Sequence, residues 1–312
     1  MDISKDSDIG SMTLAPRFHG QFPFYEVWYG KLNFDENRAF WFRYTLLNGK
    51  TKEAALWAIF FNGNETHFRK EIFPLETFAK TPKISIPKGY LTDTSVQGDL
   101  EDIQWNLQFK NKNGSFDHVP ALFKKLNLSK SLVCTPYLDL SITGEIYISG
   151  QRYTFQNAPG MLGHIWGKKQ ALGWTWSHCN AFENQKDVLF EGLSAQIPIL
   201  GHPSPTLTSI YFQVGNEKLC LNRCIDLFRT TSHYKRGSWK FKAKNKDFIL
   251  EGDIQSDPQK IIEIPYTDTD DTTLICHNSK LANLSLTLTE LKTNQKRCFV
   301  SKNKAALEWV TR

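Results

Sequence analysis

The chain repeats one aromatic phrase half a chain apart. The first copy runs Trp28-Tyr-Gly-Lys-Leu-Asn-Phe34, and the second runs Trp176-Ser-His-Cys-Asn-Ala-Phe182. Aligned without a gap, Trp meets Trp and Phe meets Phe. The offset, 176 − 28 = 148 residues, is close to half of the 312-residue chain and far longer than the unit of a solenoid repeat. We therefore infer that a whole domain has been duplicated in tandem.

The residue pattern of both halves predicts β-strands. Short aromatic or β-branched runs alternate with turns rich in Asn, Gly, Asp and Lys. Such runs include 26–32, 40–46, 56–61, 103–109, 173–182, 188–195, 208–214 and 248–254. Two short stretches, 120–126 and 304–309, have a helical pattern. Many strands in hairpin order favour an all-β fold of two tandem antiparallel barrels, because closure leaves no strand edge unpaired.

The ends of the two halves set the expected boundaries. Each half closes on an apolar element that contains Trp, at Trp166 and Trp309, and a basic link, Lys168-Lys169-Gln170, follows the first. We expect a disordered polar tail at 1–14, a first barrel at 15–167 and a second barrel at 168–312. A small barrel can hold one apolar ligand, although a filled barrel core is the alternative.

Bulk composition excludes several classes of protein. No stretch approaches the roughly 18 consecutive apolar residues of a membrane helix, and the polar N-terminus has no secretory signal. The 6 Cys are scattered, which favours reduced thiols and a cytoplasmic location. The net charge of +6 is dispersed, so we expect no nucleic-acid partner; peripheral membrane association through anionic lipid stays open. The oligomeric state is not determined by the sequence.

Motifs for metals and cofactors are missing from the sequence. Cys220 and Cys224 have no second Cys or His pair at zinc-ligand spacing, so no metal is expected. Phosphate-binding glycine loops, a Gly-x-Ser-x-Gly elbow and a His-Glu-x-x-His motif do not occur. We expect no cofactor.

The middle of the chain resembles the central motif of the tocopherol cyclase family. There a Trp-Gly pair is followed by a short basic link and a Trp-rich strand that ends in Cys-Asn-x-Phe-Glu, as in the stretch from His164 to Glu183. The opening, Tyr25-Glu-Val-Trp-Tyr-Gly-Lys31, is similar to the family's Phe-Glu-Gly-Trp-Tyr-Phe-Lys, with Val27 and Gly30 as departures. The C-terminal stretch 274–309 is also similar in order and spacing.

This resemblance implies a fold and a chemistry. The wider superfamily includes carotenoid 1,2-hydratases and AttH-like proteins and is built of two lipocalin-like (calycin) barrels. The hydratases use a His-x-Trp pair, which His164-x-Trp166 matches. Where they carry a Tyr-x-Asp pair this chain has Phe190-Glu191-Gly192, in which Glu191 could supply a carboxyl group.

Reactions of this kind deliver a proton to an isolated C=C bond and shield the resulting carbocation. They need an acid of tuned pKa in an apolar cavity. Aromatic faces stabilise the cation by roughly 0.5–2 kcal/mol each. Alternation along strand 173–182 places one set of side chains on a common face, which suits a pocket wall: Trp174, Trp176, His178, Asn180 and Phe182. The alternative is that the Trp pair packs under a loop while backbone groups satisfy His178 and Asn180.

The candidate residues follow from these patterns. The candidate acids and orienting groups are His164, His178, Glu191 and Glu26, and the candidate ligand-binding residues are Trp28, Trp166, Trp174, Trp176, Asn180 and Phe182. Each has a structural alternative: packing at an inter-domain corner for His164 and Trp166, a strand-edge salt bridge for Glu26, and a strand-end carboxylate for Glu191.

Three functional hypotheses remain. The first is a protein that binds an elongated apolar ligand, isoprenoid or prenylated, and acts as an isomerase or lyase, an intramolecular cyclase or hydratase. The second is a non-catalytic lipid or pigment carrier of the same fold. The third is an interaction protein with filled barrels.

Overall fold

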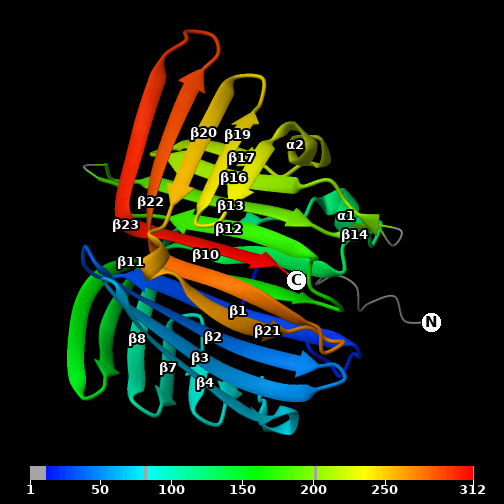
Figure 1. Ribbon diagram of the computed structural model, residues 1–312, viewed down its shortest axis with the longest axis vertical. Helices are drawn as coiled ribbons and strands as arrows, with labels where there is room; N and C mark the ends of the chain where they lie inside the picture. Colours follow the sequence, from blue (N-terminus) through cyan, green and yellow to red (C-terminus); the bar gives the residue numbers. More distant parts are fainter. Residues whose placement is uncertain (1–11, 81–82, 184, 200–201, 312) are drawn as a thin grey trace.

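The chain folds into two curled antiparallel sheets that pack against each other (Figure 1). The computed structural model describes residues 12–80, 83–183, 185–199 and 202–311. The first barrel contains β1 (Phe24–Asn33), β2 (Arg38–Asn48), β3 (Lys52–Asn62), β4 (Glu65–Pro74), β5 (Ile84–Ile86), β6 (Gly89–Leu91), β7 (Ser95–Leu100), β8 (Ile103–Asn113), β9 (Phe116–Asp117), β10 (Ser131–Ile148) and β11 (Gln151–Gly167), with η1 (Leu75–Thr77) and α1 (Ala121–Lys125).

The second barrel is built in the same way. It contains β12 (Gly173–Cys179), β13 (Val188–Gln196), β16 (Leu207–Val214), β17 (Glu217–Leu221), β18 (Thr231–Lys235), β19 (Ser238–Lys244), β20 (Phe248–Gln255), β21 (Ile262–Thr267), β22 (Thr273–Glu290) and β23 (Lys296–Thr311), with α2 (Cys224–Arg229) and η2 (Pro258–Lys260). β14 (Pro198–Ile199) and β15 (His202–Pro203) form a separate pair. Within the described residues, no helix is long and apolar enough to span a membrane.

The strand orders of the two sheets correspond position by position. The first runs β4-β3-β2-β1-β11-β10-β8-β7-β6-β5, and the second runs β17-β16-β13-β12-β23-β22-β20-β19-β18, so β5 has no counterpart on this path. β9 pairs with β10 beside the first sheet, and β21 pairs with β22 beside the second. The predicted all-β fold of two duplicated barrels is therefore confirmed.

The register of the duplication differs by one residue from the ungapped alignment. Trp166 and Trp309, which close the two halves, pair with Glu26 of β1 and Thr175 of β12. The position equivalent to Trp28 is therefore Ser177, not Trp176. Since successive side chains of a strand point to opposite faces, Trp28 and Trp176 point in different directions relative to their barrels.

The burial pattern of each strand indicates whether one or both of its faces are covered. β8 alternates strictly between buried and exposed positions over its first eight residues, because one face meets the barrel interior and the other meets water. β1 is buried at every position. One of its faces lines the first barrel and the other meets the second barrel, so its sequence reads as a nearly continuous apolar run.

This burial on two faces also explains one wrong prediction. The stretch 304–309, expected to be helical, lies within β23. Ala305, Leu307 and Trp309 face the core of the second barrel, whereas Ala306 packs at the boundary between the barrels. A short apolar run buried on both sides cannot be distinguished from a helix by periodicity. The helix expected at 120–126 is present as α1.

Apolar side chains fill the interior of each barrel. The first cluster centres on Trp28, Phe42 and Trp105, and the second on Phe190, Trp239 and Phe241. The barrels also cover each other reciprocally. The β21–β22 ladder packs on the outer face of β2 and β3, and β9 with β10 packs on the outer face of β13 and β16.

The tail predicted for residues 1–14 lies largely outside the described residues, which begin at Met12. Leu14 is inserted into the first core, and the carbonyl oxygen of Thr13 lies 2.8 Å from Nδ1 of His164. The segment from Thr13 to Phe18 therefore forms an N-terminal strap across one end of the first barrel.

Candidate functional site

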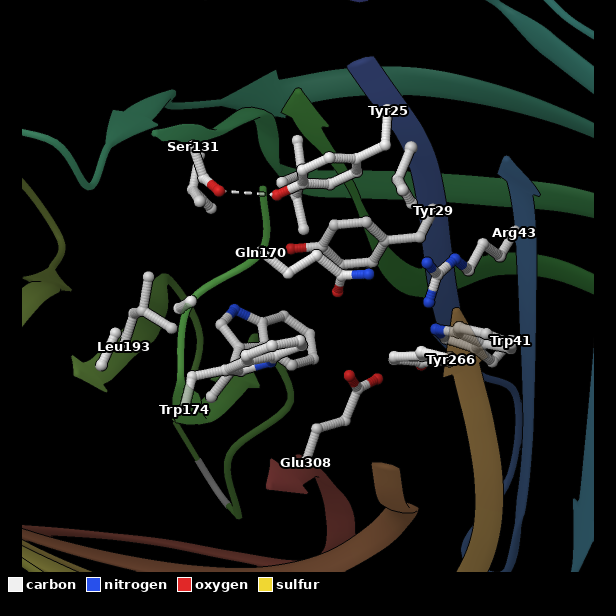
Figure 2. Close-up of a pocket in the computed structure, with 16 residues that line it drawn as sticks. Tyr25, Tyr29, Trp41, Arg43, Ser131, Gln170, Trp174, Leu193, Tyr266 and Glu308 are labelled. Atoms are coloured by element: carbon white, nitrogen blue, oxygen red, sulfur yellow. Dashed lines mark hydrogen bonds between the residues drawn. The ribbon is translucent and has the colours of Figure 1, made fainter. Parts of the chain in front are cut away.

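A pocket lies between the two barrels, formed by side chains that point away from both barrel interiors (Figure 2). Its cavity volume is about 80 Å³, and its mouth is open to solvent. β1, β2, β10 and β11 supply one side, and β12, β13, β21 and β23 supply the other. The lining residues are Tyr25, Val27, Tyr29, Trp41, Arg43, Ser131, Val133, Ile165, Gln170, Ala171, Trp174, Trp176, Leu193, Ala195, Tyr266 and Glu308.

Aromatic rings form the walls of this inter-barrel pocket. On β1, alternation turns Trp28 into the first core and Tyr25 and Tyr29 outward. On β12 the same alternation turns Trp174 and Trp176 outward. The rings of Tyr29 and Trp176 meet edge to face, with their centres 5.6 Å apart.

A glycine makes room for Tyr29. Gly163 of β11 pairs directly with Tyr29 of β1. A Cβ atom at position 163 would lie 2.2 Å from Cζ of the Tyr29 ring, closer than any van der Waals contact. The ring can therefore lie across the backbone of β11, which fixes the floor of the pocket.

A buried ion pair stands at the pocket wall. The Glu308 side chain points into the space between Trp174 and Tyr266 (Figure 2). Its Oε1 accepts hydrogen bonds from Nζ of Lys280 at 2.6 Å and from Nδ2 of Asn278 at 3.0 Å. Lys280 is fully buried, and burial lowers the pKa of its ammonium group even though Glu308 raises it. Its Nζ also lies 5.7 Å from the centre of the Trp176 ring.

Further polar groups surround this pair. Cζ of Arg43 lies 3.9 Å from the centre of the Tyr266 ring, and its Nε donates to Oγ1 of Thr45 at 3.0 Å. The Tyr266 hydroxyl is buried and makes no close hydrogen bond among the described residues, although the Cys276 thiol interacts with it. Burial raises the pKa of Tyr266 and that of Tyr29, so both phenols stay neutral and can donate. The pocket thus offers neutral donors and a cation beside a carboxylate.

Two of the predicted residues, Trp174 and Trp176, line this pocket. His178 follows on the same face but is sealed between the barrels, where its Nε2 donates to the carbonyl oxygen of Leu138 at 2.8 Å. Burial, reinforced by the charge of Lys31, lowers the pKa of His178 to about 3. It is therefore neutral near pH 7 and cannot act as an imidazolium acid.

The other two residues of that predicted face, Asn180 and Phe182, make structural contacts outside the pocket. Asn180 donates to Oδ1 of Asp139 at 2.9 Å and to the carbonyl oxygen of Gly160 at 3.0 Å. Phe182 lies beyond the end of β12 and packs against the second core. Neither is among the residues that line the inter-barrel pocket.

Glu191 forms a buried polar cluster behind the Trp176 ring. Its Oε1 accepts hydrogen bonds from Nε1 of Trp176 at 2.9 Å and from Oγ1 of Thr135 at 2.6 Å, and lies 3.1 Å from Nε2 of His118. Burial raises the pKa of Glu191, but its interactions with His118, His178 and Thr135 together outweigh burial, so the net shift is downward. Nδ1 of His118 in turn lies 2.8 Å from Oγ of Ser209. Glu191 therefore orients Trp176 from outside the pocket.

The remaining predicted residues gather under the N-terminal strap, in the first barrel. Nε2 of His164 lies 2.8 Å from Oε1 of Glu26, and both side chains are fully buried. Glu26 also accepts hydrogen bonds from the backbone N–H groups of Arg17 and Phe18, and Nε1 of Trp28 donates to the carbonyl oxygen of Leu14. The His164 ring stacks on Trp28 and also contacts the ring of Trp166.

The predicted site residues thus fall into four groups. Trp174 and Trp176 line the pocket, Glu191 lies behind it, His178, Asn180 and Phe182 lie outside it, and Glu26, Trp28, His164 and Trp166 lie under the N-terminal strap. Sequence reasoning missed Glu308, Lys280, Arg43, Tyr29 and Tyr266. One signal was available: Tyr25, Val27 and Tyr29 form an apolar row on the face of β1 opposite to Trp28. Such a two-faced strand needs a second partner surface, which is the boundary between the barrels.

Comparison with known structures bears on the fold. The crystal structure of a protein assigned as AttH from Nitrosomonas europaea matches with a TM-score of 0.60 and 11% identity, covering 96% of this chain and 99% of that one. Kievitone hydratase from Nectria haematococca gives a TM-score of 0.56 at 11% identity, over 92% and 88% of the two chains. CghA with Sch210972 gives 0.59 at 9% identity, over 93% and 88%. At these identities the likeness shows a common tandem-barrel fold.

Comparison with known sequences bears on the family. No curated protein matches the sequence significantly. A family model described as tocopherol cyclase-like matches residues 139–309, more than half of the chain. The match runs from β10 of the first barrel to β23 and so includes the basic link, the Trp-rich strand β12 and Glu308. The chain therefore belongs to the tocopherol cyclase-like family.

Proposed function

We propose that the inter-barrel pocket binds an elongated, mainly apolar substrate, isoprenoid or prenylated, and that the chain catalyses a cofactor-free, proton-initiated cyclisation or hydration of a C=C bond. The family supports this class of reaction. The observation that carries the proposal is the buried Glu308–Lys280 pair at the wall of an aromatic pocket.

The pocket walls favour an unsaturated apolar ligand. Rings and aliphatic side chains supply most of the lining, and a few polar groups from both barrels converge on it. Five aromatic rings line the pocket, those of Tyr29, Trp41, Trp174, Trp176 and Tyr266. A ring face turned toward a developing cation attracts it by roughly 0.5–2 kcal/mol. The Tyr266 hydroxyl, which makes no close hydrogen bond among the described residues, can hold a hydroxyl or carbonyl group of the substrate.

The ion pair provides the proton. Because burial lowers the pKa of Lys280, transfer of a proton from its ammonium group to Glu308 costs less than it would in water. Protonated Glu308 then gives this proton to one alkene carbon, and the neighbouring carbon becomes the carbocation. A substrate hydroxyl or a water forms the new C–O bond and returns one proton to the Glu308 carboxylate. Cyclisation gives an isomer of the substrate, and hydration adds one water.

A labelling experiment tests this mechanism. The purified protein is incubated in D₂O with a prenylated hydroquinone, and the product is examined by mass spectrometry. We expect one deuterium on carbon per turnover. Glu308→Gln keeps the shape of the side chain but cannot carry the proton, so turnover should fall by about 10²-fold or more. Glu183→Gln, which alters a partly exposed carboxylate outside the pocket, is the matched control.

A second measurement distinguishes an enzyme from a non-catalytic ligand carrier. Native mass spectrometry of gently purified protein would show whether an apolar molecule co-purifies. A co-purified ligand that Glu308→Gln retains, together with unchanged substrate in the wild-type reaction, would favour the carrier hypothesis. Full activity of Glu308→Gln would remove the proposed role of this residue.

A further inference from the structure

Two short helices carry an unusual share of the exposed apolar side chains. α1 and the turn after it expose Leu122, Leu126 and Leu128, and α2 exposes Ile225 and Phe228. Each is between 42% and 58% exposed. Exposed apolar side chains that gather in one region mark an interaction surface, whereas single ones need no explanation. We call these five residues, with Lys125, Lys130 and Arg229, the helix-tip surface.

The two helices begin side by side, although each belongs to a different barrel. Asn222, two residues before α2, donates from Nδ2 to the carbonyl oxygen of Asp117, four residues before α1, at 2.8 Å. Figure 1 shows both helices at the same end of the molecule. The exposed apolar side chains of the two barrels therefore lie in one region.

The charges of this surface are mainly positive. Lys125, Lys130 and Arg229 are exposed, and residues 118–130 contain neither Asp nor Glu. The acidic residue within α2, Asp226, is buried and paired with Arg223. Asp117, just before α1, pairs with Lys124.

A basic groove continues this surface toward the inter-barrel pocket. Its lining includes Lys124, Lys130, Lys168 and Lys169. Ser131 separates the groove from the pocket: its hydroxyl lies 2.8 Å from the Tyr25 hydroxyl and also donates to the carbonyl oxygen of Lys169. One wall of the pocket therefore lies directly behind the groove.

We propose that the helix-tip surface docks on an anionic lipid bilayer. The apolar side chains of α1 and α2 enter the interfacial region, and the neighbouring Lys and Arg side chains meet lipid phosphates. Self-association through this surface would place its cations against those of a second copy, which is unfavourable. Delivery of an apolar substrate from the bilayer to the pocket rests on the proposed function; docking itself does not.

Vesicle co-sedimentation of the full chain, without substrate, tests the docking. The vesicles contain phosphatidylcholine with about one third phosphatidylglycerol. We expect the wild type to sediment with them, and Leu126→Asp with Phe228→Asp to bind about tenfold more weakly or worse. Ile72→Asp is the matched control, because Ile72 is 53% exposed but lies on β4. It should bind like the wild type.

Two further measurements give the contribution of charge to vesicle binding. One uses the double variant Lys125→Gln with Arg229→Gln, and the other uses the wild type with vesicles of phosphatidylcholine alone. Binding should fall several-fold in both cases. Equal sedimentation of the wild type and the Asp variants would overturn the proposal, as would wild type that stays in the supernatant. A dimer that the Asp variants convert to monomers, seen by light scattering, would assign the surface to a second copy instead.

Turnover of a detergent-dispersed prenylated hydroquinone distinguishes this inference from the proposed function. The Leu126→Asp and Phe228→Asp variants should retain that turnover, because neither residue lines the pocket. Loss of vesicle binding with turnover intact supports docking. Absence of turnover in the wild type, with vesicle binding intact, overturns the catalytic proposal alone.

Discussion

At the scale of single residues, the boundary between the barrels contains ionisable groups sealed from water. His178 is the sharpest case, since it is fully buried, its Nδ1 has no partner among the described residues, and Lys31 and Glu191 lie close enough to affect its pKa. A neutral imidazole is tolerated here, whereas an imidazolium is not. The stability of the inter-barrel boundary should therefore depend on pH through this residue.

The lowered pKa of His178 predicts a pH dependence of stability. The unfolded chain takes up a proton near pH 6.5, but the folded chain does so only near pH 3. The contribution of His178 to the free energy of unfolding is therefore fully present above pH 6.5. It falls as the pH drops toward 3, by up to about 1.4 kcal/mol per pH unit for one proton. The free energy of unfolding, measured with urea at several pH values in this range, should depend less steeply on pH for His178→Gln than for the wild type. An identical slope would assign the acid sensitivity to other groups.

Gly163 provides a second test at the same scale. Because a methyl group at this position would clash with the Tyr29 ring, Gly163→Ala should displace Tyr29 and cost about 1–3 kcal/mol. Ligand binding should weaken with it. Tyr29→Val removes the ring, so the double variant should be more stable than the sum of the two single changes predicts. Additive losses, measured by chemical denaturation, would show that the clash is relieved elsewhere.

At the scale of elements, the sequence predicts where the strands lie but not which partner each face of a strand meets. Aromatic alternation and turn residues predicted the strands because a one-sided strand such as β8 carries its own pattern. β1, β12 and the part of β23 from 305 to 310 are buried at most or all positions on both faces, and their sequences do not mark which face meets which partner.

The site was missed for this reason. The ungapped Trp28–Trp176 alignment is off by one residue, and a one-residue shift exchanges the interior and outer faces of every strand. Trp174 and Trp176 were correctly expected to share a face, but that face meets the other barrel and not a ligand inside the second one. Glu308 went unnoticed because β23 resembled a helix. Only the packing of two barrels brings it opposite Tyr29 and Arg43.

The N-terminal strap is an element whose contribution can be measured. Leu14 is 3% exposed within the first core, and the strap backbone meets the buried Glu26 and His164. Leu14→Ala should therefore lower the free energy of unfolding by about 2–5 kcal/mol. Met12→Ala, at an exposed neighbouring position, should change it by less than about 0.5 kcal/mol. Equal effects of the two changes would show that the strap does not seal the barrel in solution.

At the scale of the whole molecule, each barrel supplies part of the other's cover. β21 and β22 bury the outer faces of β2 and β3, and the start of β10 buries those of β13 and β16. The Glu191 cluster crosses the same boundary, since His118 and Thr135 come from the first half and Glu191 comes from the second. Stability and the pocket therefore depend on both halves together.

Expression of the halves as separate chains, residues 12–167 and 168–312, tests this dependence. Alone, the first half would expose Trp41, Trp57 and Tyr29, and the second would leave Glu191 without His118. We expect each half to aggregate or to unfold without cooperativity, because large apolar faces and a buried carboxylate lose their partners. Refolding the halves together should give a one-to-one complex that regains ligand binding, as seen by native mass spectrometry. Two halves that each unfold cooperatively with the full-length midpoint would show independent barrels, and the pocket would then form between domains that need not stay together.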